Sequence, residues 1–320
     1  MNEYSPLISH FDALLLDLDG VVYIGPHAVA HASASLVRSR AAGVSIAFVT
    51  NNASRPPEVV ADHLRELGIQ ASARDVVNAS QAAARVIAER VPAGSTVLAV
   101  GGPGVRAALV DRGLVPVYSA DPTPTAVMMG YGPDVGWKDL AEASYAVQAG
   151  SLFVATNPDT SFPTPRGIAP GNGTLVAAVA TATGRQPIVA GKPYTPLVVE
   201  SIERVGAARP LMVGDRLDTD IEAAHNAGID SLLVMTGVTN VRDVLLASPV
   251  HRPTFIAADL RSLFLASHES RVARDVGEGA LAPLLSAAAA AWERADNGHD
   301  PLSEVDIAAL EALVRAELAR

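Results

Sequence analysis

Short apolar runs alternate with amphipathic stretches along most of the chain. The runs are compact and almost wholly apolar, as in strands that are buried on both faces of a parallel sheet. Between two of them, residues 57–67 carry apolar side chains at helical spacing and are followed by Gly68, a helix-ending residue. The alternation predicts an α/β fold with a Rossmann-like parallel sheet. We expect its strands at residues 13–16, 44–49, 209–213, 231–235 and 254–256.

The same alternation begins again in the middle of the chain, between residues 79 and 183. This block is long enough to form a domain of its own, so we interpret it as a smaller α/β domain inserted into the first. We expect strands at residues 96–100, 126–129 and 152–155, and helices at residues 79–90, 105–112, 137–149 and 174–183.

The C-terminal part of the chain has a different pattern. Residues 284–294 and 304–319 predict two helices joined by a polar segment. Residues 303–306 read Ser-Glu-Val-Asp and fit a capping box at the start of the second helix. An apolar stripe follows at Ile307, Leu310, Leu313, Val314 and Leu318. We interpret this end as a helical hairpin that packs on the body, with an oligomer or partner surface as the alternative.

The overall composition narrows the possible partners. The chain carries 34 acidic against 24 basic residues, a formal net charge of −10, which argues against a nucleic-acid partner. It has no cysteine, which excludes disulfides, thiolate zinc sites, iron–sulfur clusters and a cysteine nucleophile. The first residues lack the positive charge and apolar core of a signal peptide, and the longest apolar runs are too short to cross a membrane. We therefore expect a cytoplasmic protein with no membrane partner.

Two carboxylates follow the first expected strand directly. Asp17 and Asp19 stand at positions i and i+2 and are followed by Gly20. Ligands of open parallel sheets bind beyond the carboxyl ends of strands, and two acids there are costly unless a cation or a substrate compensates them. The spacing lets one carboxylate attack or ligate while the other handles protons, although an acidic turn without function has the same sequence.

Polar groups suited to phosphate follow two further segments. Thr50, Asn51 and Asn52 end the second expected strand with a hydroxyl and two amides, which can bind a phosphoryl oxygen without adding charge. Lys192 is one of only two lysines in the chain and stands between Gly191 and a proline. A fixed ammonium there can neutralise a phosphate. A plain turn and a surface lysine are the alternatives.

A third acidic strand end follows residues 209–213. Asp215 comes after Gly214, and Asp220 follows five positions later. Asp215 could complete an all-oxygen site with the first pair of acids, and carboxylate oxygens are the ligands that suit Mg²⁺. The alternative is a capped helix start that is rich in Asp.

Taken in order, these four segments resemble the four motifs of the haloacid dehalogenase (HAD) superfamily of phosphatases. The D-x-D-G-V, T-N-N, G-K-P and G-D-R-L-x-T-D-I wording is similar to that of its NagD-like subfamily (class IIA, C2-type cap), which includes glycerol 3-phosphate phosphatases. The resemblance covers about residues 10–265. It implies a HAD core at residues 1–78 and 184–267, an inserted α/β cap domain at 79–183 and a C-terminal helical extension at 268–320.

The resemblance also implies a Mg²⁺-dependent phosphatase that forms an aspartyl-phosphate. Asp17 would be the nucleophile, and Asp19 would protonate the leaving alcohol and then deprotonate the hydrolytic water. Mg²⁺ would be held by Asp17, the backbone carbonyl of Asp19 and Asp215. Asp220 would not bind the ion directly but would orient Lys192 or a metal-bound water.

The remaining motif residues are implied to bind the substrate. Thr50 and Lys192 would bind the transferring phosphoryl group, and Asn51 would help through its amide or its backbone N–H. Gly20 and Asn52 are expected beside them.

The choice of substrate is expected to depend on the inserted domain. Asn157 and Asp159 lie in a polar loop that resembles the cap loop facing the active site in NagD-like enzymes, and residues 171–174 form a second loop for which a structural turn is equally possible. Both loops offer small polar groups and no aromatic wall, which favours a small hydroxylated substrate such as glycerol 3-phosphate. Phosphoglycolate, pyridoxal phosphate and nucleotides are the alternatives, a non-catalytic phosphate sensor is a further one, and a homodimer is possible.

One segment imitates a dinucleotide site. Residues 102–107 read G-x-G-x-x-A between an expected strand and an expected helix, with Asp121 further on. Pro103 inside the turn limits the N–H donors that could hold a pyrophosphate. We therefore prefer a tight turn at a helix start over NAD binding.

Overall fold

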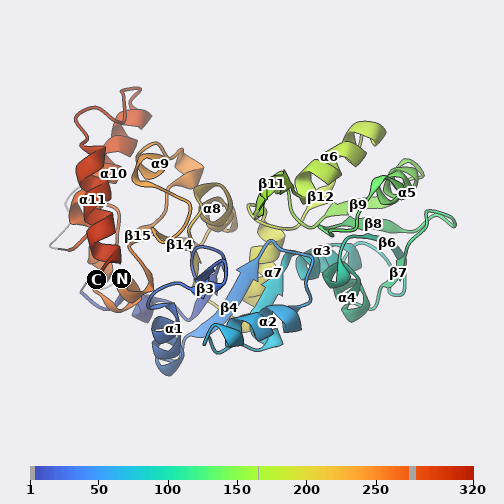
Figure 1. Ribbon diagram of the computed structural model, residues 1–320, viewed down its shortest axis with the longest axis horizontal. Helices are drawn as coiled ribbons and strands as arrows, with labels where there is room; N and C mark the ends of the chain where they lie inside the picture. Colours follow the sequence, from blue (N-terminus) through green and yellow to red (C-terminus); the bar gives the residue numbers. More distant parts are fainter. Residues whose placement is uncertain (1–3, 165, 274–278) are drawn as a thin grey trace. The chain divides into compact units, whose positions relative to one another are not determined.

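The computed structural model describes residues 4–164, 166–273 and 279–320. Its internal contacts divide the chain into two compact units, coloured along the sequence in Figure 1. Unit 1 comprises Met1–Phe48, Leu64–Gln70 and Ser201–Arg320, and unit 2 comprises Val49–His63 and Ala71–Glu200. The domain boundaries expected from the sequence were drawn from the positions of the motifs. This division by contacts does not test them, so they stay a prediction.

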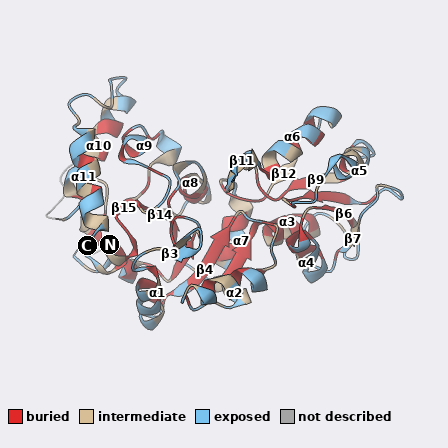
Figure 2. Ribbon diagram, in the orientation of Figure 1, coloured by how far each residue is buried: buried red, intermediate tan, exposed pale blue. Residues whose placement is uncertain are grey.

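A parallel sheet forms the centre of unit 1. Its strands run in the order β15-β14-β13-β1-β4, and every neighbouring pair is parallel. Leu16, the last residue of β1, is opposite Val213 on one side and Phe48 on the other. The strands are buried along nearly their whole length (Figure 2), as the wholly apolar runs predicted. Their bounds are β1 (Ala13–Leu16), β4 (Ser45–Thr50), β13 (Pro210–Gly214), β14 (Asp230–Val234) and β15 (Phe255–Ala257).

The helices of unit 1 include the expected C-terminal hairpin. Side chains from the last helices share one core cluster with Leu233 of β14 and Ile256 of β15, so the hairpin packs on this sheet. Trp292 of α10 also donates its indole N–H to the carbonyl of Val244, at 2.8 Å. The helices are α1 (Ala32–Ala41), α8 (Glu222–Ala227), α9 (Val241–Leu245), α10 (Ala282–Asp296) and α11 (Ile307–Leu318), with a small antiparallel ribbon of β2 (Tyr23–Ile24) and β3 (His27–Ala28).

The prediction of a capping box at Ser303 is wrong. Helix α11 begins three residues later than expected, and Asp306 is its N-cap, with its side chain accepting from the N–H of Ala309. Glu304 has a φ of 62°, a left-handed conformation that interrupts any helix beginning at Ser303. Asp is itself a preferred N-cap residue, and here it replaces Ser303 in that role.

Unit 2 is built on a second parallel sheet with the order β12-β9-β8-β6-β7. Alternate strand residues, among them Leu98 and Val127, form a core cluster with helices α5 and α6 on one face, while α3 and α4 lie against the other face (Figure 1). The strands of the sheet are β6 (Thr96–Val100), β7 (Val115–Val117), β8 (Ala126–Met129), β9 (Leu152–Ala155) and β12 (Ile188–Val189). The helices are α3 (Ala79–Ala88), α4 (Pro103–Asp111), α5 (Trp137–Gln148) and α6 (Asn172–Thr183).

Unit 2 also contains an antiparallel hairpin of β10 (Ser161–Thr164) and β11 (Gly167–Pro170). Strand β5 (Val76–Asn78) follows β4 in the order of the first sheet and belongs to unit 2 together with the last two residues of β4. Two helices, α2 (Pro57–Glu66) and α7 (Thr195–Val205), run from one unit into the other along the chain.

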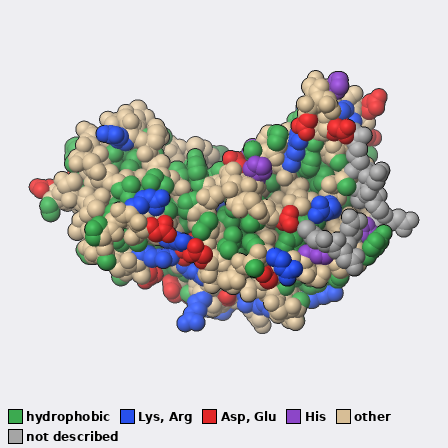
Figure 3. All heavy atoms as spheres, turned by 180° about the vertical axis from the view of Figure 1, so that it is seen from behind, with side chains coloured by type: hydrophobic (Ala, Val, Ile, Leu, Met, Phe, Trp, Pro, Cys, Tyr) green, Lys and Arg blue, Asp and Glu red, His purple; other side chains and the backbone are tan. Residues whose placement is uncertain are grey.

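The surface carries charges of both signs. On the face shown in Figure 3, basic and acidic side chains are intermixed rather than gathered by sign. Within residues 4–164, 166–273 and 279–320, the structure contains no helix that is both long and apolar enough to cross a membrane.

Candidate active site

Two of the predicted acids lie on neighbouring strands of the unit 1 sheet. Asp17 directly follows β1 and Asp215 directly follows β13, and the register pairs Leu16 with Val213. The N–H of Asp17 donates to the carbonyl of Val213, at 2.9 Å, which continues the ladder by one step. The carboxyl ends of adjacent parallel strands meet at one edge of a sheet, so the fold itself brings these carboxylates together.

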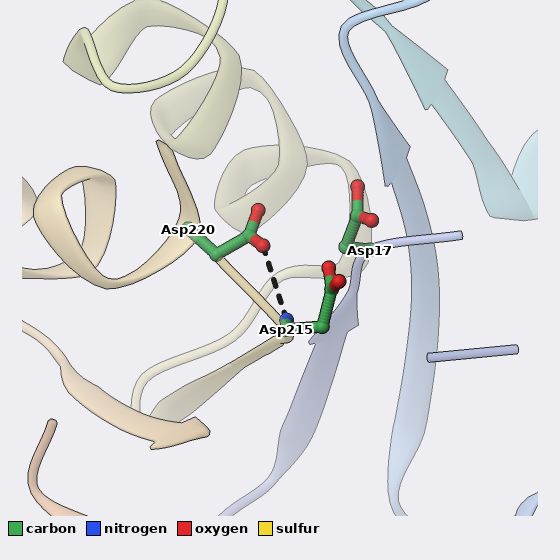
Figure 4. Close-up of side chains that lie close together, drawn as sticks. All are labelled: Asp17, Asp215 and Asp220. Atoms are coloured by element: carbon green, nitrogen blue, oxygen red, sulfur yellow. Dashed lines mark hydrogen bonds between the residues drawn. The ribbon is translucent and has the colours of Figure 1, made fainter. Parts of the chain in front are cut away.

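Three carboxylates form a cluster at this edge. Asp17, Asp215 and Asp220 each offer an oxygen, and these atoms lie within 4.8 Å of one another (Figure 4). Asp215 is 1% exposed and Asp220 is 0% exposed, while Asp17 is partly exposed. Two like charges about 4 Å apart repel by about 4 kcal/mol at an effective dielectric constant of about 20. The cluster therefore favours a bound cation.

The chemistry of the cluster fits Mg²⁺. Its donors are carboxylate oxygens, which hard divalent cations prefer. The backbone also comes unusually close to one of them. A Cβ atom at Gly20 would lie 2.4 Å from Oδ2 of Asp215, and a Cβ at Gly237 would lie 1.9 Å from the same oxygen. Only glycine fits at these two positions, so the protein encloses the Asp215 carboxylate with main chain.

Asp220 holds the turn that carries Asp215. Its Oδ2 accepts hydrogen bonds from the N–H groups of Asp215, at 3.2 Å, and of Arg216, at 3.1 Å, the first of which is drawn in Figure 4. The turn packs tightly, because a Cβ at Gly214 would lie 2.1 Å from the Cβ of Asp220. The Asp220 carboxylate therefore holds the backbone of this turn from within the buried part of the site.

Asp19 differs from the other acids in its exposure. Its side chain is exposed, whereas Gly20 beside it is buried. Gly20 has a φ of 82°, which favours glycine, and its N–H donates to the carbonyl of Tyr23 at 2.8 Å. This turn reverses the chain after Asp17 and leaves the Asp19 carboxyl group accessible to solvent.

In unit 2, the predicted phosphate-binding residues form a network of their own. Lys192 is only 2% exposed, and its ammonium donates to the carbonyl of Val49 at 3.3 Å. The side chain of Asn51 is bonded to the backbone of Lys192 on both sides, since its Oδ1 accepts from the Lys192 N–H at 2.8 Å and its Nδ2 donates to the Lys192 carbonyl at 3.0 Å. The carboxamide of Asn51 therefore fixes the backbone of Lys192, which leaves a role toward phosphate to the backbone N–H of Asn51.

The polar loop predicted to contact the substrate joins this network. Asn51 also donates to the carboxylate of Asp159, at 3.2 and 3.4 Å, and Asn157 donates to the carbonyl of Asn51 at 2.8 Å. The start of α6 also holds the loop, since Asn172 donates to the Asn157 carbonyl at 2.9 Å. The glycines of residues 171–173 allow this close approach, because a Cβ at Gly173 would lie 2.1 Å from the carbonyl oxygen of Pro158. The second loop is thus a structural turn beneath the first.

Two other predicted residues sit in a local turn. Thr50 is 6% exposed, and its hydroxyl accepts from the N–H of Asn52 at 3.1 Å. The amide oxygen of Asn52, an exposed residue, accepts from both the N–H and the hydroxyl of Ser54.

The dinucleotide-like segment has a structural explanation. The N–H of Gly104 donates to the carbonyl of Ser54 at 3.1 Å, and a Cβ at Gly104 would lie 2.4 Å from the carbonyl of Ala53. A neighbouring loop of the same unit thus covers the start of α4, where a pyrophosphate would have to bind. This supports a tight turn at a helix start, the interpretation preferred above.

The loop after β14 was not predicted from the sequence to be part of the site. Residues 235–239 approach the Asp17–Gly20 turn through a bond from the Thr236 hydroxyl to the carbonyl of Gly20, and they approach Asp215 through the glycine contact described above. The available signal is the Thr236-Gly237 pair at the end of an apolar strand, in the same position as the three strand ends that were singled out.

Comparison with known proteins agrees with the motifs. A family model described as haloacid dehalogenase-like hydrolase matches residues 14–115, and a model described as HAD-hydrolase-like matches residues 189–263. The chain is 45% identical over 309 residues to the D-glycerol 3-phosphate phosphatase of Mycobacterium tuberculosis, an alignment that covers 94% of this chain and 86% of that protein. The chain belongs to the haloacid dehalogenase-like hydrolases. The predicted superfamily is thereby confirmed, and the chain is an enzyme of the hydrolase class.

Solved structures and other relatives agree with this assignment. The glycerol phosphate phosphatase of M. tuberculosis, solved in complex with magnesium, superposes with a TM-score of 0.86 at 41% identity, covering 95% of this chain and 99% of that one. A p-nitrophenyl phosphatase from Archaeoglobus fulgidus gives a TM-score of 0.73 at 27% identity over 79% of this chain and 98% of its own. An acid sugar phosphatase of Staphylococcus aureus is 37% identical over 74% of this chain and 91% of its own length.

Proposed function

We propose that this hydrolase is a Mg²⁺-dependent phosphomonoester phosphatase whose substrate is a small phosphorylated metabolite, glycerol 3-phosphate in the first place. The observation that carries the proposal is the cluster of Asp17, Asp215 and Asp220 at the carboxyl ends of β1 and β13. The choice of glycerol 3-phosphate is supported by the 45% identity with a D-glycerol 3-phosphate phosphatase along nearly the whole chain.

The covalent chemistry is assigned to the first two acids. A carboxylate oxygen of Asp17 attacks the phosphorus atom, and the bond from phosphorus to the alcohol oxygen breaks as Asp19 gives that oxygen a proton. Asp19 then takes a proton from a water molecule, whose oxygen attacks the phosphorus and releases Asp17 and inorganic phosphate. The accessible Asp19 suits an exchange of protons with both the leaving alcohol and water.

Mg²⁺ would be held by the carboxylates of Asp17 and Asp215 and by the backbone carbonyl of Asp19. When bound, it offsets the negative charge that otherwise repels a phosphate from three acids. Asp220 would keep Asp215 in place through the two backbone hydrogen bonds, a role that differs from the expected orientation of Lys192 or a metal-bound water.

The phosphoryl group would be bound by Thr50, Lys192 and the N–H of Asn51, and Gly20 and Asn52 are further proposed substrate-binding residues. The placement of Lys192 supports this role, because its buried ammonium is held by the carbonyl of Val49 at the end of a strand. The bonds from Asn51 to the Lys192 backbone would keep the ammonium in one place.

The alcohol part of the substrate would be selected by Asn157 and Asp159. These are small polar groups suited to hydroxyls, and the observed bonds from Asn51 and to Asn157 hold the loop in one shape. Phosphoglycolate, pyridoxal phosphate and nucleotides remain the alternative substrates. The acid sugar phosphatases among the relatives add sugar phosphates to the set worth testing.

A panel of phosphomonoesters tests the proposal. Release of inorganic phosphate from glycerol 3-phosphate, phosphoglycolate, pyridoxal phosphate, a sugar phosphate, a nucleotide and p-nitrophenyl phosphate is compared at equal concentration. We expect the highest kcat/KM for glycerol 3-phosphate and loss of activity when EDTA removes divalent cations. A clear preference for an aromatic or nucleotide ester would reject glycerol 3-phosphate while keeping the phosphatase.

The variant Asp17→Asn separates an enzyme from a phosphate sensor. The substitution conserves shape but removes the nucleophile, so turnover is expected to fall to background while far-UV circular dichroism is unchanged. Retained turnover would reject the assignment of Asp17.

A homodimer, given above as a possibility, and the expected cytoplasmic location stay predictions. Sedimentation and cell fractionation can check them.

A further inference from the structure

The loop that follows β14 holds two parts of the proposed metal site at once. The hydroxyl of Thr236 donates to the carbonyl of Gly20, and the N–H of Val238 donates to Oδ2 of Asp215 at 2.7 Å. The N–H of Thr239 also donates to the backbone carbonyl of Asp215, at 3.3 Å. All these residues belong to unit 1, so the arrangement does not depend on unit 2.

The bond from Thr236 fixes the turn that carries Asp19. Gly20 is held on both sides, because its carbonyl accepts from Thr236 and its N–H donates to Tyr23. The N–H of Gly20 and the carbonyl of Asp19 belong to the same planar peptide group. The bond to Tyr23 therefore sets the direction in which the Asp19 carbonyl points. The bond from Thr236 holds the next peptide group, that of Gly20 and Val21, and so keeps the turn at Gly20 in place.

The bond from Val238 fixes the carboxylate of Asp215. A carboxylate can turn about its last side-chain bond, and this turn has a broad, soft energy profile. The hydrogen bond to Oδ2 selects one orientation and so sets where Oδ1 points. Gly237 makes the bond possible, since any side chain there would overlap the carboxylate.

The loop is itself anchored at its far end. Asn240 caps α9 with a reciprocal pair of bonds, since its Oδ1 accepts from the N–H of Asp243 and Asp243 accepts from the N–H of Asn240. Val241 and Val244 of α9 are then buried in the core cluster shared with α10 and α11. The loop is thus a short span between two packed elements and not a free segment.

We propose that Thr236 is a positioning residue for the metal site, which acts through Gly20 and, with Gly237 and Val238, through Asp215 to orient the oxygens that bind Mg²⁺. The inference rests on the proposed function for the identity of the ion. Residues that orient metal ligands without touching the ion typically contribute about 10- to 100-fold in affinity.

The test measures Mg²⁺ binding directly, by calorimetric titration of the full chain without substrate. Thr236→Val removes the hydroxyl and keeps the size, and we expect its Kd for Mg²⁺ to rise about 10-fold. Thr236→Ser keeps the hydroxyl and is expected to bind within about 2-fold of the original chain, well short of that loss. Gly237→Ala, which pushes on the carboxylate instead, is expected to weaken binding as well.

A control separates this effect from general destabilisation. Thr183→Val removes another threonine hydroxyl bonded to a backbone carbonyl, that of Val179 at 2.8 Å, in helix α6 of unit 2. It is expected to leave the Kd for Mg²⁺ unchanged. Thermal unfolding without Mg²⁺ shows whether each variant is folded, and if Thr236→Val is not, Thr236→Ala, which also lacks the hydroxyl, takes its place.

The two proposals fail in different ways. If the original chain binds no Mg²⁺ at millimolar concentration, the proposed metal site and the inference built on it are both rejected. If the original chain binds Mg²⁺ and folded Thr236→Val binds it equally well, or Thr236→Ser is as weak as Thr236→Val, only the positioning role is overturned.

Discussion

Oδ2 of Asp220 lies 3.2 Å from the backbone nitrogen of Asp215 and accepts its hydrogen bond. The two residues are five positions apart and are both almost fully buried. The charge of one acid is thus used to hold the backbone of the other. This relationship explains how one carboxylate of an acidic cluster can support the site by holding the backbone of another.

The first prediction concerns Asp220. Asp220→Ala leaves the N–H groups of Asp215 and Arg216 without their acceptor, and an unsatisfied buried donor costs about 1–3 kcal/mol. We expect a loss of that order in the free energy of unfolding, measured in urea, together with weaker Mg²⁺ binding. Asp220→Asn keeps an accepting oxygen and is expected to lose less stability.

The control for Asp220 lies in the same turn. Asp218 is exposed and pairs with the exposed Arg216 at 2.9 Å. Such surface pairs contribute about 0–1 kcal/mol. Asp218→Ala is therefore expected to be nearly neutral, and an equal loss in both alanine variants would contradict the special role of Asp220.

The second prediction separates the two roles of Asp19. With glycerol 3-phosphate, the leaving alkoxide needs a proton, so Asp19→Asn is expected to lower kcat by about 10²- to 10⁴-fold. With p-nitrophenyl phosphate, the leaving group is stable as an anion, so the first step should survive while the hydrolysis of the aspartyl-phosphate is slowed. Stopped-flow absorbance should then show a burst of about one nitrophenolate per enzyme.

The nucleophile variant is the reference for that experiment. Asp17→Asn cannot form the phosphoryl-enzyme and should show no nitrophenolate burst. A burst in Asp17→Asn would reject Asp17 as the nucleophile, and the absence of a burst in Asp19→Asn would show that the first step needs more from Asp19 than a proton for the leaving group.

Much of the fold and of the acidic cluster could be predicted from the sequence. Strand β1 was expected at its observed bounds, because a wholly apolar run followed by an acid has few other interpretations. The meeting of Asp17 and Asp215 was expected from the resemblance of their motifs to a known family, and the adjacency of β1 and β13 that produces it was not predicted from the sequence. Local pattern was sufficient for the strand and its acid, and the strand order needed the structure.

Other features depend on contacts that sequence spacing does not reveal. Asn51 was interpreted as a phosphate ligand, yet its carboxamide bonds to Lys192, 141 positions away, and to Asp159, 108 positions away. Likewise, the loop at Thr236 reaches Gly20 across 216 positions. A short polar side chain at a strand end can serve a ligand or the protein itself, and only the tertiary structure distinguishes the two.

The third prediction uses that network in unit 2. Asn51→Asp keeps the oxygen that accepts from the Lys192 N–H but replaces the donor to Asp159 and to the Lys192 carbonyl with a second carboxylate oxygen. The repulsion and the lost bonds are expected to lower the free energy of unfolding by about 1–3 kcal/mol. Hydrogen exchange should quicken in the loop around Asn157 first.

Asn52→Asp is the matched control for that variant. Asn52 is exposed, and its oxygen, which accepts from Ser54, is kept in aspartate. We expect stability close to that of the original chain. Similar losses in both variants would mean that added charge, not the bond to Asp159, is responsible.

The fourth prediction concerns pH and the C-terminal hairpin. The carboxylate of Asp296, at the end of α10, accepts two hydrogen bonds of 2.7 Å from Arg252, which lower the pKa of Asp296 below its usual value. A group whose pKa is lower in the folded state stabilises the protein above its unfolded pKa and loses that effect as the pH falls through its folded pKa. The urea midpoint of Asp296→Asn should therefore lie below that of the original chain at pH 7, and the gap should close as the pH falls below about 4. A gap that stays constant from pH 7 to pH 3 would mean that the ion pair does not stabilise the hairpin.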